Sequence, residues 1–298
     1  MKKLLIPALF IFWFTKTYAQ QKEVTITIDP ISENIYMLTG QGGNIGVFKN
    51  EKGLFIIDDQ FARLSDKILK NLKTISDQPV SMVINTHFHG DHTGGNENMT
   101  SQGATIFAQK NVRSRMESNQ KEKGNITPQS LPVITFDEGL QLYFNSESIK
   151  AYHVHNAYTD GDALIYFANG NVLHMGDTFF NGRYPYIDLK SGGSIQGYIN
   201  ASEKALLIAN DDTKIIPGHG SLATKKDLEG FSRMLKEITN AIQKEIDAGK
   251  SKDDITKNTS LTATYDAKGF GDGFINSERI RQTIYMSLTK ENKTQKSL

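Results

Sequence analysis

Short stretches of alternating or continuous hydrophobic residues dominate the first part of the chain. Such stretches are typical of β-strands, and they occur at residues 23–28, 34–38, 45–48 and 53–58. Between Phe61 and Ile75 the apolar residues recur every three or four positions instead, which predicts an amphipathic helix. The segment VSMVIN at 80–85 is apolar on both faces, the pattern of a strand buried within a sheet.

Strand-like and helical patterns continue to alternate along the rest of the chain. Further strands are expected at residues 104–108, 132–136, 140–144, 148–154, 162–168, 171–177 and 213–217, and helices after 108 and at 195–209, 226–248 and 277–290. Strands mixed with helices predict an α/β domain built of layers. Because neither an internal repeat nor a long Pro/Gly linker interrupts the pattern, we expect one domain over residues 20–298.

The first 19 residues have the pattern of a secretory signal peptide. Lys2 and Lys3 precede the apolar run from Leu4 to Phe14, and the small residues Thr17 and Ala19 suit cleavage after Ala19. The apolar run is well short of the roughly 20 residues that a transmembrane helix needs. We therefore expect a periplasmic or secreted protein with no stable membrane anchor.

The amino-acid composition excludes some kinds of cross-link, metal ligand and partner. The chain has no cysteine, so it has neither disulfides nor thiolate ligands. Its net charge is +1, and removal of residues 1–19 takes away three lysines and no acid. A nearly neutral surface gives no reason to expect nucleic acid as a partner, and it fits a small-molecule substrate.

Three of the seven histidines lie in the segment THFHGDH at 86–92, directly after the buried strand. On an extended backbone, residues two apart point the same way, so His87, His89 and Asp91 are expected to share a face. His92 follows where the chain turns into a helix, and Gly90 allows a tight backbone there. Imidazoles combined with a carboxylate suit zinc or iron. The segment therefore predicts a metal site.

This His-x-His-x-Asp-His segment resembles the metal-binding motif of the metallo-β-lactamase superfamily. The resemblance extends over residues 24–290, because LHMGDTFF supplies Asp177 and IIPGHG supplies His219 where that family has its late ligands. It implies a four-layer αβ/βα sandwich with two metal positions at one edge. The first position would use His87, His89 and a later histidine, the second would use Asp91, His92 and His219, and Asp177 would bridge both.

The later histidine of the first position is missing. In the family it stands immediately before a Thr-Asp turn, and here Tyr158 stands before Thr159–Asp162. Three alternatives follow. In the first, the first metal position keeps only its remaining ligands and solvent, and is weak or empty. In the second, Tyr158 binds the metal as a phenolate, and in the third, His155 or His153 reaches the metal instead. A phenolate would need the metal to pull the tyrosine pKa down from about 10.

Other residues around these motifs are candidates for supporting roles. Asp58, at the end of GLFIID, resembles an aspartate that orients a ligand from behind. His174 lies an odd number of positions before Asp177, so a regular strand would turn it away from the site. The loop at 179–197 is rich in aromatic residues and glycine, and its Phe180, Tyr184, Tyr186, Arg183 and Lys190 are candidates for contact with a substrate.

The resemblance implies an exported zinc-dependent hydrolase that binds one or two Zn²⁺ ions and uses a metal-bound hydroxide. The expected targets are amide, lactam or ester bonds, including those of β-lactam antibiotics, and Asp91 would act as the catalytic carboxylate. Two alternatives remain: a glyoxalase-like thioester hydrolase, and a metal-binding protein with little catalysis because Tyr158 replaces a ligand.

Overall fold

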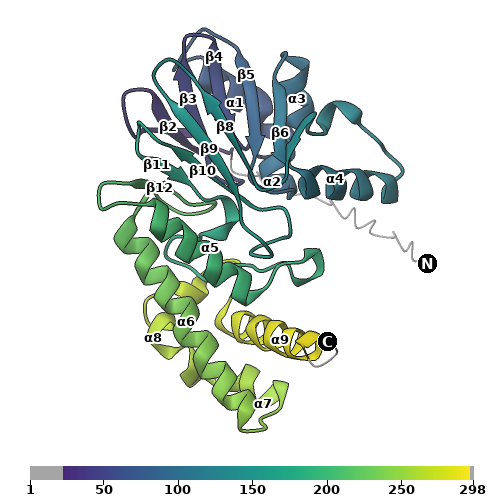
Figure 1. Ribbon diagram of the computed structural model, residues 1–298, viewed down its shortest axis with the longest axis vertical. Helices are drawn as coiled ribbons and strands as arrows, with labels where there is room; N and C mark the ends of the chain where they lie inside the picture. The colour runs from purple at the N-terminus through teal and green to yellow at the C-terminus, as the bar shows by residue number, and fades with distance from the viewer. Residues whose placement is uncertain (1–22, 296–298) are drawn as a thin grey trace, which may run out of the picture.

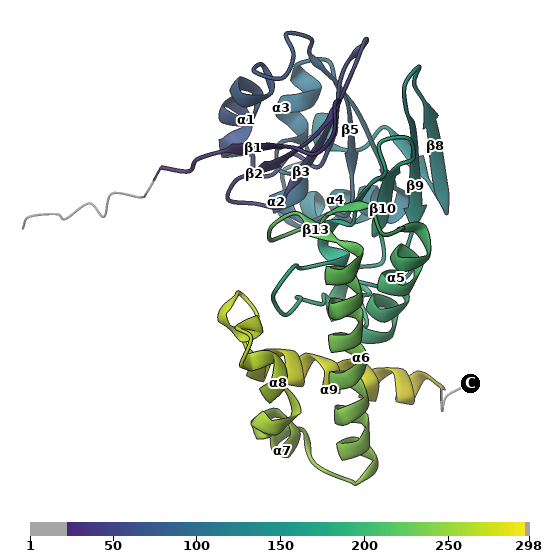
Figure 2. The same ribbon diagram turned by 90° about the vertical axis from the view of Figure 1, so that its left-hand side faces the viewer.

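Two β-sheets lie face to face in the computed structural model, which describes residues 23–295 (Figures 1 and 2). The predicted signal peptide at 1–19 lies outside the described residues. In the first sheet the strands follow chain order: β1 (Thr27–Pro30), β2 (Ile35–Thr39), β3 (Ile45–Asn50), β4 (Gly53–Ile57), β5 (Val80–Asn85), β6 (Thr105–Gln109) and β7 (Ile134–Phe136). Pairing is antiparallel from β1 to β4 and parallel from β4 to β7.

The second sheet runs in the order β13-β12-β11-β10-β9-β8. Its strands are β8 (Gly139–Tyr143), β9 (Ser148–His153), β10 (Ala163–Phe167), β11 (Val172–His174), β12 (Lys214–Ile216) and β13 (Ala223–Thr224). Only β11 and β12 pair in parallel, and the other neighbours are antiparallel. The carboxyl ends of β11 and β12 therefore meet at one edge of the sheet.

Nine α-helices flank the sheets within residues 23–295: α1 (Ser65–Leu72), α2 (Gly90–Thr93), α3 (Asn96–Ser101), α4 (Lys110–Glu122), α5 (Ile195–Ile208), α6 (Lys225–Asp247), α7 (Lys252–Lys257), α8 (Ala263–Asp266) and α9 (Ser277–Gln295). Helices α1 and α3 lie outside the first sheet, and α5 lies outside the second (Figure 2). None of these helices is long and apolar enough to cross a membrane.

Alternation along the central strands produces the four layers. In β4, Phe55 and Ile57 belong to the core between the sheets, whereas Leu54 and Ile56 pack towards α1. In β10, Ile165 likewise faces the first sheet. The layers are thus helices, sheet, sheet and helices, which confirms the predicted αβ/βα sandwich.

The last helices extend beyond the sandwich. Figure 2 shows α9 crossing the long helix α6, with α7 and α8 beside them. The hydrophobic core that includes Leu164 and Leu173 of the second sheet continues to Ile280 and Ile284 of α9. The single-domain prediction is untested, but this continuous core agrees with it.

Two element predictions need correction. The expected helix from Phe61 to Ile75 is a short 3₁₀ turn followed by α1, which ends at Leu72. The first strand begins at Thr27, not at residue 23, because Thr27 pairs with Thr39, the last residue of its neighbour β2. Residues 23–26 have no partner strand, although their alternating pattern is that of one.

Candidate metal centre

The loops that follow β5, β11 and β12 bring all six predicted ligands together. His87 and His89 lie between β5 and α2, and Asp91 and His92 lie within α2. Asp177 lies in a 3₁₀ turn just after β11, and His219 follows β12. Residues that are far apart in the sequence therefore lie together at one edge of the sandwich.

The expectation that His87, His89 and Asp91 share one face is wrong. The strand ends at Asn85, and α2 begins at Gly90, so the extended alternation stops before it reaches Asp91. The helical turn directs Asp91 and His92 towards His219, while His87 and His89 lie with Asp177.

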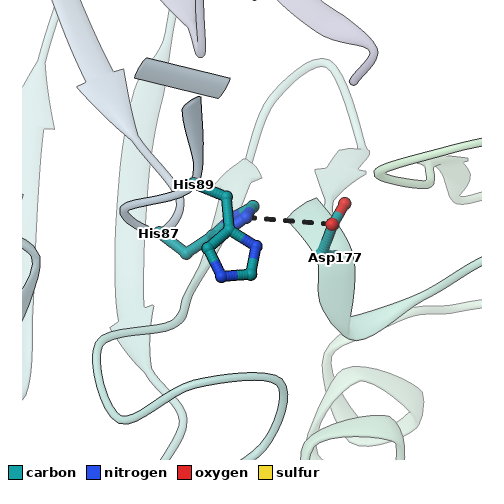
Figure 3. A group of neighbouring side chains, drawn as sticks. All are labelled: His87, His89 and Asp177. Carbon is teal, nitrogen blue, oxygen red and sulfur yellow. Dashed lines mark ion pairs between the residues drawn. The ribbon is translucent and has the colours of Figure 1, made fainter. Parts of the chain in front are cut away.

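Two groups of three side chains could each hold a metal ion. In each group, one ligand atom per residue lies within 4.8 Å of the others, and the groups are His87, His89 and Asp177 (Figure 3), and Asp91, His92 and His219. The dashed line in Figure 3 joins His87 Nε2 to Asp177 Oδ2 over 3.8 Å.

Asp177 also contacts the second group. Its Oδ1 lies 3.1 Å from His92 Nε2 and 3.4 Å from His219 Nε2. Burial opposes ionisation of this carboxyl, but the two histidines hold its pKa well below the usual range. The side chain is therefore an anion between the two groups, as a bridging ligand has to be.

The donor atoms fit a metal ion. His87 Nε2, His92 Nε2 and Asp177 Oδ1 are buried without a well-aligned hydrogen-bond partner, although the last two lie 3.1 Å apart, and buried polar atoms are normally satisfied. A divalent ion that accepts nitrogen and oxygen ligands would satisfy all three. The backbone also leaves room for the ligands, because a Cβ at Gly43 would collide with the His92 ring and one at Gly218 with Asp177 Oδ1.

Asp58 lies directly behind the ligands and fixes two of them. Its carboxylate accepts hydrogen bonds from Thr86 N, Thr86 Oγ1 and His92 Nδ1, each 2.7–2.8 Å long. Because the Thr86 hydroxyl donates to Asp58, it accepts from His87 Nδ1 at 3.0 Å. Both Nδ1 atoms are thereby engaged behind the site, and both Nε2 atoms face it. Burial opposes a charge on His92, but Asp177 and Asp58 raise its pKa well above its usual value, so without an ion its Nε2 carries a proton that a metal would displace.

The Tyr158 hydroxyl lies where the missing histidine was expected. Its oxygen is 2.7 Å from His89 Nδ1, and His89 Nε2 lies 3.2 Å from Asp188 Oδ2. Because a carboxylate only accepts, Nε2 carries the proton, and the Tyr158 hydroxyl donates to Nδ1. Burial, and after it the charges of Asp177 and Asp91, raise the pKa of Tyr158 well above its usual value in the metal-free protein.

Asp188 was not identified from the sequence. It lies eleven residues after Asp177 in an irregular loop, where no periodicity assigns a direction to its side chain. Burial would raise its pKa, but hydrogen bonds from His89 and Ser191 lower it to about 2.

The remaining histidines lie outside the cluster. His153 Nδ1 contacts the Asp162 carbonyl at 2.8 Å, and the exposed His155 contacts Glu138 at 3.0 Å. The structure therefore does not bring His155 to the metal site or its pocket, because the chain turns at Asn156 (φ 51°) only after both histidines. His174 is buried, its Nε2 contacts the Asn44 carbonyl at 3.1 Å, and it belongs to neither candidate ligand group.

A cavity of about 410 Å³ opens above the ligands. The exposed edges of Asp91 and His219 lie on its floor, with Asp177, and aromatic and basic side chains form its walls. The lining residues are His89, Asp91, Tyr158, Asp177, Phe180, Arg183, Tyr184, Tyr186, His219, Phe274, Ile275 and Arg279. Lys190 is not among them.

The fold and ligand set define a class of metal-dependent hydrolases. The sequence profile of the metallo-beta-lactamase superfamily matches residues 38–219, which include all six candidate ligands, and the chain belongs to this superfamily.

Similarity to individual proteins is more distant. The chain is 23% identical over 166 residues to a "Metallo-beta-lactamase type 2" of Elizabethkingia meningoseptica, covering 51% of this chain and 62% of that protein. It is 26% identical over 210 residues to a "Hydroxyacylglutathione hydrolase" of Nitrosococcus oceani, covering 62% and 73%.

Solved structures show the same fold. A metallo-β-lactamase from Pontibacter korlensis superposes with a TM-score of 0.61 at 17% identity, covering 71% of this chain and 99% of that one. The DIM-1 metallo-β-lactamase superposes with a TM-score of 0.60 at 17% identity, covering 72% and 99%.

Proposed function

We propose that the protein is an exported zinc-dependent hydrolase that cleaves amide, lactam or ester bonds of small molecules. The observation that supports this most directly is the pair of candidate ligand groups joined by Asp177, because members of both groups line one open pocket. The predicted signal peptide supports a periplasmic or secreted location, in which β-lactams and lactones are candidate substrates.

A divalent ion held by these residues would polarise the substrate carbonyl and make hydroxide available near neutral pH. The side chains of the protein would bind the ion and position the groups that take part in the reaction. Asp91 is the best candidate for proton transfer, because its side chain is 26% exposed to the pocket and its Oδ2 lies 3.3 Å from His219 Nε2. Burial opposes its ionisation, but His219 and His92 lower its pKa to about 2, so it is a carboxylate at neutral pH.

The two ligand groups differ in the number of side chains that are available to bind zinc. Asp91, His92 and His219, with Asp177 beside them, provide four ligands. The other group has Asp177 and only two imidazoles, and one of these, His89, already accepts a hydrogen bond from Tyr158. We therefore propose that the Asp91 group holds the tightly bound ion and that the His87 group is weak or empty.

Thioester hydrolysis is the second candidate activity. The similarity to a hydroxyacylglutathione hydrolase and the bridging position of Asp177 favour it. Metal binding with little catalysis is the third possibility, and the Tyr158 hydroxyl at His89 is the observation that favours it.

Activity and metal content of the mature protein test these proposals together. Zinc per chain would be measured by mass spectrometry, and turnover with nitrocefin, a lactone, an aryl ester and an acyl thioester. We expect zinc-dependent turnover, and the isosteric variant Asp91→Asn to lower kcat at least a hundredfold. Asp211→Asn, on a side chain that is 97% exposed, is the matched control. Bound zinc without turnover of any substrate would instead favour a metal-binding protein.

A further inference from the structure

One wall of the pocket is a continuous row of aromatic rings that begins at the metal ligands. The Tyr186 ring centroid lies 6.3 Å from that of His89 and 5.8 Å from that of Tyr158. Phe274 continues the row, edge to face with Tyr186 at 6.1 Å, and is 77% exposed. An exposed phenyl ring at the rim of a cavity is unfavourable in water and offers apolar contact to a ligand.

Arg279 lies beside the outer end of this row. Its guanidinium carbon is 5.5 Å from the Tyr186 centroid and 5.3 Å from the Phe274 centroid. The position is anchored, because Arg279 N donates to Asn276 Oδ1 at 2.8 Å where α9 begins. Two aromatic faces thus hold the cation by cation–π attraction.

The guanidinium of Arg279 has no anionic partner among the side chains that the structure describes. Among residues 23–290, no carboxylate lies within ion-pair distance of Arg279, whereas Arg113 pairs with Glu117 at 2.8 Å. Arg183, from the loop after Asp177, also lines the pocket without an ion-pair partner among these residues. Two guanidinium groups without an ion-pair partner among these residues therefore line a pocket that is also lined by candidate metal ligands.

We propose that Arg279, assisted by Arg183, binds a carboxylate of the substrate while an adjoining apolar group of the substrate lies on Tyr186 and Phe274. A planar carboxylate matches the paired N–H donors of a guanidinium. The substrate class is then a small amide, lactam, ester or thioester that carries a carboxylate beside an apolar group. This assignment rests on the proposed hydrolase function for the identity of the bond that is cleaved.

The carboxylate site depends on the C-terminal helical segment. Phe274 and Arg279 lie beyond residues 38–219, the region that the superfamily profile matches. The proposed substrate site therefore combines Arg183 and Tyr186, from the region that carries the candidate metal ligands, with Phe274 and Arg279 from the C-terminal segment.

Binding of a matched pair of probes tests the assignment without requiring turnover. The probes are 3-phenylpropionate and its uncharged amide, titrated into the zinc-loaded mature protein by calorimetry. We expect the carboxylate to bind about tenfold more tightly than the amide, as one charge-assisted contact allows. Arg279→Gln should abolish the preference, and Arg279→Lys, which keeps the charge but loses the planar fork, should retain part of it. The control is Arg63→Gln, since Arg63 also lies over an aromatic ring, Phe61, at 4.6 Å but does not line the pocket.

Two results would overturn the proposal. One is an equal affinity of the unsubstituted protein for both probes. The other is a carboxylate preference that persists in Arg279→Gln, which would mean that the carboxylate binds the metal. A preference that depends on Arg279 in a protein that hydrolyses none of the test substrates would support the binding site and count against the hydrolase function.

Discussion

At the scale of single residues, the state of His89 decides how many metal ions the protein can hold. Its Nε2 donates to Asp188, and its Nδ1 accepts from Tyr158. An imidazole nitrogen has one lone pair, so a zinc ion can use Nδ1 only by displacing the Tyr158 hydroxyl proton. His92, by contrast, has its Nε2 unsatisfied.

The variant Tyr158→His should restore a second zinc site. It removes the competing hydroxyl and adds a nitrogen ligand, so we expect zinc to rise from about one ion per chain to about two. Mass spectrometry of the native, metal-loaded protein measures the count directly.

Tyr158→Phe is the matched control for this prediction. It removes the same hydroxyl but adds no ligand, so we expect a smaller gain in zinc than with histidine. Two tightly held ions in the unsubstituted protein would contradict the prediction and would favour the phenolate as a ligand.

At the scale of elements, short-range patterns located most strands and helices but not every boundary. The strand at 80–85 was predicted as it is found, because a run that is apolar on both faces has few alternatives. The short helices α7 and α8 were missed, since six and four residues are too few to show a helical period. The start of β1 at Thr27 is set by the length of its partner β2, which is not a property of the residues of β1 itself.

The end of β11 connects the two sheets through a neutral histidine, and this makes stability depend on pH. His174 Nε2 donates to the Asn44 carbonyl, and Nδ1 accepts from Gly176 N, both at 3.1 Å. Protonation of Nδ1 would oppose the second bond, and burial lowers the pKa of His174 from 6.5 to about 4.

Because the unfolded chain binds the His174 proton more readily, the contribution of this residue to stability is complete above pH 6.5. It is lost progressively as the pH falls towards 4, by about 3 kcal/mol in all. Urea unfolding of the metal-free protein between pH 7.5 and 4.5 measures the slope. In His174→Gln, which does not titrate, the slope should be shallower than in the unsubstituted protein. Equal slopes would exclude this role for His174.

At the scale of the whole molecule, the helices after β13 share their core with the sandwich. Ile284 of α9 is fully buried in the cluster that also contains Leu164 of β10. Removal of its side chain should therefore destabilise the whole structure and not a separate helical unit.

Ile284→Ala should lower the free energy of unfolding by about 2–4 kcal/mol. Denaturant unfolding would be followed by far-UV circular dichroism and by tyrosine fluorescence. Both signals should show a single transition, shifted to a lower denaturant concentration. Met286→Ala is the control, because Met286 lies on the same helix and is 37% exposed. An early separate transition in Ile284→Ala would mean that the C-terminal helices form a domain of their own.

The sequence by itself determined the layered fold class, the six candidate ligand residues and the absence of an imidazole at position 158. These properties depend on local periodicity and on residue types at fixed spacing, which a linear pattern carries. Only the tertiary structure decided that Asp91 turns away from His87, that Asp188 and Tyr158 occupy both nitrogens of His89, and that Arg279 reaches the pocket. Each of these is a contact between segments far apart in the chain, and its geometry follows from how the sheets and the last helices pack.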